Sequence, residues 1–306
     1  MAGLPSPRRS PHALALGVVS LQDITTSAPG LRFAVRFPAA PGGAERAAVA
    51  HEADTPHPLA GTGKLFLAVA VARLAERDPG LLVSPLTIRG EHRAAARSGT
   101  LRRMSGELQL TLDDAMALVV GTGDGACVTA LLGLLEARGV YVLAEAQQVV
   151  ADLGLDATTF TGLESSAGDR DGVQAGESWG DGLLGRTTPD DLCTLLEHLA
   201  IGGEPTSERV LAWMDKAFEP AGLASALPGF GPRTIPHRTV SGVELLAPPG
   251  GPGCASVLIL PADAGTGRPT ACVAAYHPRS RGADSTAYAP EASAVLGSLG
   301  LAVARS

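Results

Sequence analysis

Segments that favour β-strands lie near both ends of this chain, and helical segments occupy its middle. Residues 31–37 alternate apolar and basic side chains, and residues 45–51 follow a Pro-Gly-Gly turn, so together they predict a β-hairpin. Three more strands are expected at residues 239–246, 255–260 and 271–276, separated by Pro- and Gly-rich turns. This order predicts an α/β (α+β) fold in which one antiparallel sheet is assembled from both chain ends and flanked by helices.

The middle of the chain predicts an inserted all-helical lobe. Residues 63–77 are apolar on nearly every face, as expected for a helix buried at the centre of a core. Further helices are expected at residues 12–27, 115–120, 126–138, 140–153, 192–200, 207–218 and 289–303. We therefore divide the chain into an α/β lobe, residues 1–64 and 201–306, and a mainly helical lobe, residues 65–200. A Gly-, Ser- and Asp-rich stretch at residues 162–185 predicts a long loop within the helical lobe.

Composition excludes several classes of partner. The net charge is −7 and the basic residues are scattered, which argues against nucleic acid and against an anionic membrane surface. No apolar run approaches the ~20 residues that cross a bilayer. The four cysteines have no C-x-x-C spacing and lie in apolar surroundings, which predicts buried free thiols rather than zinc ligands. Arg8-Arg9 precedes an apolar stretch, but no A-x-A cleavage site follows, so we expect a cytoplasmic protein. We also expect no metal or cofactor.

Three short motifs carry a resemblance to a known family. Gly61-Thr62-Gly63-Lys64 opens the buried helix, Gly123-Asp124-Gly125 lies in the helical middle, and Arg238-Thr239-Val240 begins a C-terminal strand. In order and separation they resemble the S-x-x-K, S-D-N and K-T-G motifs of class A serine β-lactamases and their penicillin-binding relatives. The likeness extends from about residue 31 to residue 303. It includes Thr187-Thr188-Pro189, which is similar to a helix start in that family, and residues 97–101, which are similar to the stretch leading into its helical lobe.

The resemblance implies a set of site residues. The catalytic candidates are Lys64, Asp124 and Glu164, with Glu177 as a second possibility for the carboxylate of the long loop. The substrate-binding candidates are Gly61, Thr62, Gly123, Gly125, His237, Arg238, Thr239 and Ser241. Two of these residues have an alternative, structural role. The family's aspartate orients neighbouring backbone, as Asp124 would here, and Lys64 would be an ammonium paired with Glu164 or with a carbonyl oxygen.

Individual side chains qualify this set. Arg238 keeps a positive charge that would pair with a substrate carboxylate. Thr62 is a poor substitute nucleophile, because one step along a helix turns the side chain by about 100°. His57 and His237 are candidates for titration near neutrality, although a lone histidine at the surface or behind the site is the commoner outcome.

Glycine at position 61 removes the nucleophile on which acyl transfer depends, so ordinary β-lactam hydrolysis is not expected. The backbone N–H groups of Gly61 and Ser241 would still hold a carbonyl oxygen. We therefore expect non-covalent cyclisation, isomerisation or elimination of a small molecule that carries a carbonyl and an anionic group, in specialised-metabolite biosynthesis. Two alternatives stay open: an inactive protein that binds a metabolite or a protein partner, and a residual hydrolase that uses Thr62, Ser241 or water.

Overall fold

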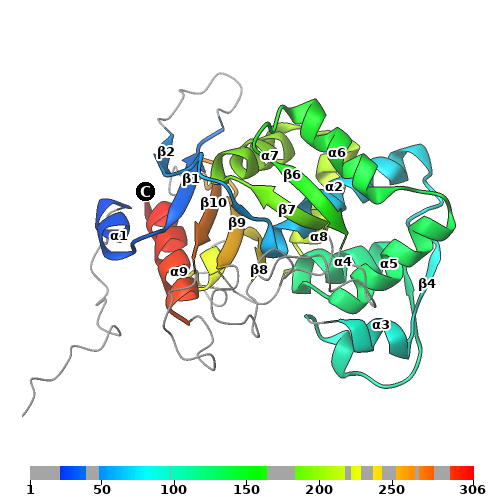
Figure 1. The fold of residues 1–306 in the computed structure, drawn as a ribbon. Helices are drawn as coiled ribbons and strands as arrows, with labels where there is room; N and C mark the ends of the chain where they lie inside the picture. Colours follow the sequence, from blue (N-terminus) through cyan, green and yellow to red (C-terminus); the bar gives the residue numbers. More distant parts are fainter. Residues whose placement is uncertain are drawn as a thin grey trace, which may run out of the picture.

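A five-stranded antiparallel sheet lies at the centre of the molecule, in the order β2-β1-β10-β9-β8 (Figure 1). The computed structural model describes residues 21–38, 48–96, 98–163, 183–217, 222–228, 237–242, 253–265, 269–278 and 290–306. Strands β1 (Arg32–Arg36) and β2 (Val49–His51) come from the N-terminal part of the chain. Strands β8 (Arg238–Gly242), β9 (Cys254–Leu260) and β10 (Ala271–His277) come from the C-terminal part. The prediction that both ends build one sheet is confirmed.

The two faces of this sheet pack against different helices (Figure 1). Alternating side chains of β9 separate them: Leu258 packs with α1 (Leu21–Ser27) and α9 (Pro290–Arg305), whereas Val257 and Ile259 pack toward the helical middle of the chain. All seven residues of β9 are buried, because helices cover both faces.

Most helices of the middle region lie close to the ranges predicted from the sequence. Helix α2 runs from Gly63 to Arg77 as predicted, and most of its residues are buried on every side. The remaining helices of this region are α3 (Gly90–Ala95), α4 (Leu112–Thr122), α5 (Gly125–Ala137), α6 (Val142–Leu153), α7 (Pro189–Ile201) and α8 (Pro205–Met214). Thr111 and Thr188 cap α4 and α7 through their side-chain oxygens, as their positions before Asp-rich first turns predict.

The middle region is not all-helical. It contains the hairpin of β4 (Pro85–Ile88) and β5 (Leu108–Thr111), and a small sheet in the order β3-β7-β6. Strands β6 (Thr159–Leu163) and β7 (Leu183–Thr187) occupy the two ends of the segment predicted as a loop, and β3 (His57–Pro58) pairs with β7. A Cβ on Gly185 would lie 1.9 Å from the Thr159 carbonyl oxygen, so this glycine marks a close approach of two strands rather than a loop.

Some predicted features lie outside the described residues, among them residues 12–20 of the first helix, residues 243–246, Glu164 and Glu177. The division into lobes at residues 64/65 and 200/201 stays a prediction. All four cysteines are free and buried, as predicted, and burial raises the pKa of each thiol.

No helix among those described is alone long and apolar enough to cross a membrane. Helices α5 and α6 together reach such a length and composition, but they meet at a bend of 98°.

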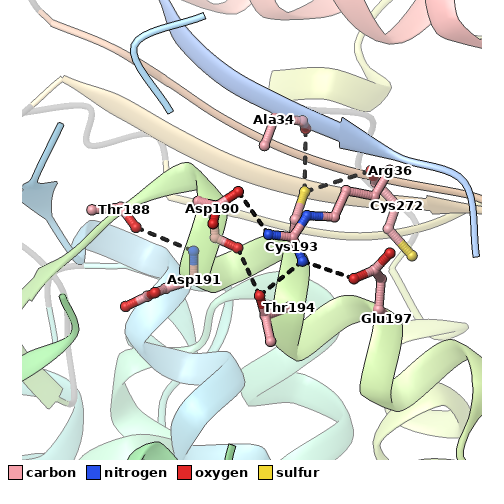
Figure 2. A network of polar contacts seen from close by, with 9 residues as sticks. All are labelled: Ala34, Arg36, Thr188, Asp190, Asp191, Cys193, Thr194, Glu197 and Cys272. Atoms are coloured by element: carbon pink, nitrogen blue, oxygen red, sulfur yellow. Dashed lines mark hydrogen bonds and ion pairs between the residues drawn. The ribbon is translucent and has the colours of Figure 1, made fainter. Parts of the chain in front are cut away.

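An arginine on β1 fastens helix α7 to the sheet (Figure 2). The Arg36 guanidinium donates hydrogen bonds to Asp190 at 2.6 Å and to Glu197 at 2.8 Å, and also to the Thr194 hydroxyl at 2.9 Å. Beside it, the Cys193 thiol donates to the Ala34 carbonyl oxygen at 3.2 Å. Burial would lower the pKa of Arg36, but the two carboxylates outweigh that effect and raise the pKa above its ordinary value.

Replacing Arg36 with methionine should lower the free energy of unfolding by about 1.5–3 kcal/mol, because two carboxylates would then face each other without their shared cation. Urea unfolding at pH 7 measures this. The control is Arg77→Met, since Arg77 is 58% exposed and pairs with Glu145 alone; its cost should stay below about 1 kcal/mol. Equal losses in the two variants would contradict the role given to Arg36.

Candidate functional site

The Lys64 side chain lies at the first turn of α2 and is only 5% exposed. Its Nζ donates a hydrogen bond to the Gly123 carbonyl oxygen at 2.9 Å and approaches the Ser98 Oγ at 3.4 Å. The Ser98 hydroxyl in turn donates to the same Gly123 oxygen at 2.6 Å. The structure therefore brings together Lys64 and Gly123, which the sequence placed in one site, and adds a serine hydroxyl to them.

Gly123 suits this contact because it carries no side chain. It ends α4 in the left-handed region, with φ 65°, which glycine adopts at low cost. A Cβ at this position would lie 3.1 Å from the lysine Nζ. The lysine amine can therefore donate its hydrogen bond directly to the backbone carbonyl of Gly123.

Ser98 was missed in the sequence analysis, although it belongs to the segment that supported the resemblance. Its neighbour Gly99 has φ 84°, and a Cβ on Gly99 would lie 2.4 Å from the Cα of Asp124. The turn around Ser98 is thus pressed against the turn that contains Gly123. Glycine directly after a serine was the available signal for such a close approach, but it does not say which segment is approached.

The Asp124 carboxylate accepts hydrogen bonds from backbone N–H groups. It is fully buried and caps α5, where Oδ1 accepts hydrogen bonds from the N–H groups of Ala126 and Cys127 at 3.1 and 3.2 Å. Its Oδ2 accepts from the N–H of Leu101 at 2.8 Å. These contacts favour the alternative role, in which Asp124 orients neighbouring chain, over a direct part in chemistry. Gly125, the next candidate, is the first residue of α5 and is buried.

Arg238 has a carboxylate partner that the sequence did not reveal. Its Nε lies 2.7 Å from Asp215 Oδ1, and its Nη2 donates to Asp215 Oδ2 at 3.0 Å. Asp215 follows the last residue of α8 and is 48% exposed. A ligand anion at Arg238 therefore has to share or displace this contact.

The predicted segments do converge, but their hydroxyl groups do not. The short helix η1 (Ala60–Thr62), which carries Gly61, packs against β8 and β9. Thr62 is fully buried, and its hydroxyl donates to the Leu59 carbonyl oxygen at 2.5 Å. The Thr239 hydroxyl donates to the Val257 carbonyl oxygen at 2.9 Å within the sheet.

Register explains the orientation of Thr239. Thr239 pairs with Leu258, whose side chain packs on the α9 face, and directly opposed side chains share a face. Ser241 pairs through its backbone with Ser256, while its side chain lies outside the described part of the structure. His237 is partly buried just before β8.

His57 is a buried histidine that does not titrate near neutrality, in line with the commoner of the two outcomes weighed for it. It is fully buried and stacks on Tyr276, with ring centroids 4.5 Å apart and planes at 6°. Its Nδ1 lies 2.8 Å from the Pro58 carbonyl oxygen and must donate the proton, since a carbonyl oxygen only accepts. Burial, with a smaller contribution from the charges of Arg32 and Arg186, lowers the pKa of His57 to about 4.

This shift makes stability depend on pH. Below the ordinary histidine pKa of about 6.5, the unfolded chain takes up a proton that the folded chain refuses, so stability is lost as the pH falls from about 6.5 toward 4. Between pH 7 and pH 5 this group should cost about 2 kcal/mol in urea unfolding. His57→Phe, which can retain the ring stack, should remove that part of the pH dependence; an unchanged pH dependence would refute the assignment.

Among the residues that the structure describes, no three His, Cys, Asp or Glu side chains are grouped so that they could hold a metal ion.

Comparisons with known proteins agree with this architecture. Residues 20–242 match the model of a family described as the beta-lactamase enzyme family. No curated protein sequence matches the chain significantly.

Three solved structures illustrate the likeness of fold. A β-lactamase from Sphaerobacter thermophilus is 20% identical, with 89% of each chain covered and a TM-score of 0.64. A β-lactamase from Xanthomonas campestris is 18% identical, with 94% of this chain and 98% of that chain covered and a TM-score of 0.65. A variant of PBP-A, solved as an acyl-enzyme complex with penicillin G, is 20% identical, with 93% of each chain covered and a TM-score of 0.62.

Proposed function

This chain belongs to the beta-lactamase enzyme family, and we propose that it uses the fold non-covalently, on a small molecule that carries a carbonyl and an anionic group. One observation carries the proposal. Lys64, the amine that would activate a serine in this family, bonds to the Gly123 carbonyl oxygen and to Ser98, while position 61 is glycine. The neighbouring Thr62 hydroxyl is buried and bonded to Leu59, so it does not replace the missing nucleophile.

Lys64 and Ser98 are the groups we assign to proton transfer. Cyclisation, isomerisation and elimination each move a proton at a carbon or oxygen next to a carbonyl, and an amine beside a hydroxyl supplies both an acid and a base. The N–H groups of Gly61 and Ser241 would polarise the carbonyl. The anionic group would lie near Arg238 and share its charge with Asp215.

We propose that this reaction belongs to the biosynthesis of a specialised metabolite. The support is the altered motifs, because glycine at positions 61, 123 and 125 implies chemistry unlike that of the family.

A second candidate is binding without turnover, of a metabolite or a protein partner. The contact between Arg238 and Asp215 favours this candidate over turnover of an anionic substrate, because a substrate anion would have to share or displace that contact. The internal hydrogen bonds of Thr62 and Thr239 point the same way, since these groups are occupied before any ligand arrives.

The first test asks whether an acyl-enzyme forms. Incubation with penicillin G or an activated ester should leave the intact mass unchanged, because position 61 offers no oxygen to acylate. The PBP-A variant that has been captured as an acyl-enzyme with penicillin G is the positive control.

A stoichiometric adduct would instead support the residual hydrolase, and peptide mapping would distinguish Ser98 from Thr62 and Ser241. Gly61→Ser should remain a poor β-lactamase, because Gly123 and Gly125 still lack the side chains of the family's loop.

The second test uses a ligand found by native mass spectrometry of metabolite extracts. Lys64→Met keeps the length of the side chain but removes the amine, so turnover should vanish while affinity changes little. Ser98→Ala should slow turnover by about 10²-fold or more, the usual contribution of a positioned proton-transfer group. Arg238→Ala should chiefly weaken binding, by about 1.5–3 kcal/mol. Turnover that survives in Lys64→Met would rule out the assigned chemistry, and binding with no turnover in the unaltered protein would establish the second candidate.

A further inference from the structure

Two arginines converge on one backbone carbonyl, that of Pro56. Arg32, the first residue of β1, donates from Nη1 to the Pro56 carbonyl oxygen at 3.0 Å. Arg186 in β7 donates from Nη2 to the same oxygen at 3.1 Å. The two nitrogens therefore lie within about 6 Å of each other, a separation at which two like charges repel appreciably.

Little negative charge balances this pair. Glu52 lies 3.7 Å from the Nε of Arg32, and it is 52% exposed. Within the described part of the chain no carboxylate forms an ion pair with Arg186, which is exposed. Each guanidinium carries five N–H donors, and among the described residues the Arg186 guanidinium has one hydrogen-bond acceptor, the Pro56 carbonyl oxygen.

The Arg32 side chain packs on the aromatic ring of Tyr276. Its guanidinium lies 5.6 Å from the centre of the Tyr276 ring, and the other contact of that ring is the stacked His57. The Tyr276 hydroxyl accepts a hydrogen bond from the N–H of Gly253 at 3.1 Å. A cation fixed on a rigid aromatic surface loses little conformational freedom when it binds a ligand.

We propose that Arg32 and Arg186 form a binding site for an oxyanion, the carboxylate or phosphate group of a small molecule. Two forked guanidiniums suit the oxygens of such a group, and the anion would relieve their mutual repulsion. This site goes beyond the proposed function and does not depend on it.

The Glu52 carboxylate would compete with a bound anion for Arg32. Among the described residues other than glycine, Glu52 is the one with a positive φ, 46°. That backbone conformation is costly for a side-chain-bearing residue, and here it accompanies a carboxylate directed toward Arg32. Removal of the Glu52 charge should therefore strengthen anion binding.

The test measures the thermal unfolding midpoint of the full chain against concentration of inorganic phosphate and, separately, of succinate, with sodium chloride at matched ionic strength as the baseline. We expect a saturable rise with at least one oxyanion and none with chloride. Arg186→Gln should weaken the apparent Kd by about tenfold or more. The apparent Kd of Arg186→Lys should lie between those of the unaltered protein and Arg186→Gln, because lysine keeps the charge but loses the forked geometry of the guanidinium. Glu52→Gln should bind the anion more tightly than the unaltered protein.

Arg209→Gln is the matched control, because it removes an exposed arginine elsewhere on the surface, and it should respond like the unaltered protein. The comparison of phosphate with succinate identifies which group the site prefers. A response that chloride reproduces, or that persists in Arg186→Gln, overturns the proposal, as does no response to either oxyanion.

Discussion

The hydrogen bond from Lys64 to the Gly123 carbonyl oxygen lets a charged side chain enter the core. Helix α2 is apolar almost throughout, and an amine buried at its start without acceptors would cost several kcal/mol. The acceptors come from two other turns, one ending α4 and one containing Ser98. The position of α2 therefore fixes the turns that contain Gly123 and Ser98. These turns surround the Lys64 amine and so define the candidate site.

Residues retained from the family's motifs divide into two groups when their contacts are known. Asp124 caps α5 and ties down Leu101, so folding alone accounts for it. Lys64 caps no helix, but its amine joins the turn of Gly123 to the turn of Ser98 through hydrogen bonds. The buried amine therefore has a structural role too, and its part in chemistry belongs to the proposal.

Much of the fold could be predicted from local patterns. The continuous apolar content of residues 63–77 predicted the bounds of α2. Helices α4 and α7 were also predicted, and each begins after a threonine cap. The alternation of residues 31–37 identified β1. Strands β6 and β7 were missed because composition alone resembles a loop there, and the reason for Gly185 lies in a strand that is distant in sequence. Asp215 and Ser98 were missed for the same reason, since the partners of Arg238 and Lys64 are set by packing between elements.

The arrangement of the central sheet has a consequence for how the chain acquires its structure during synthesis. Strand β10 lies between β1 and β9, so β1 pairs with a segment that is synthesised long after it. Until then the apolar face of β1 and its unpaired backbone groups have no native neighbour on that side. Contacts between segments so far apart in sequence form slowly, and exposed strand edges promote aggregation. Nascent chains of this protein should therefore depend on chaperones until β10 is complete.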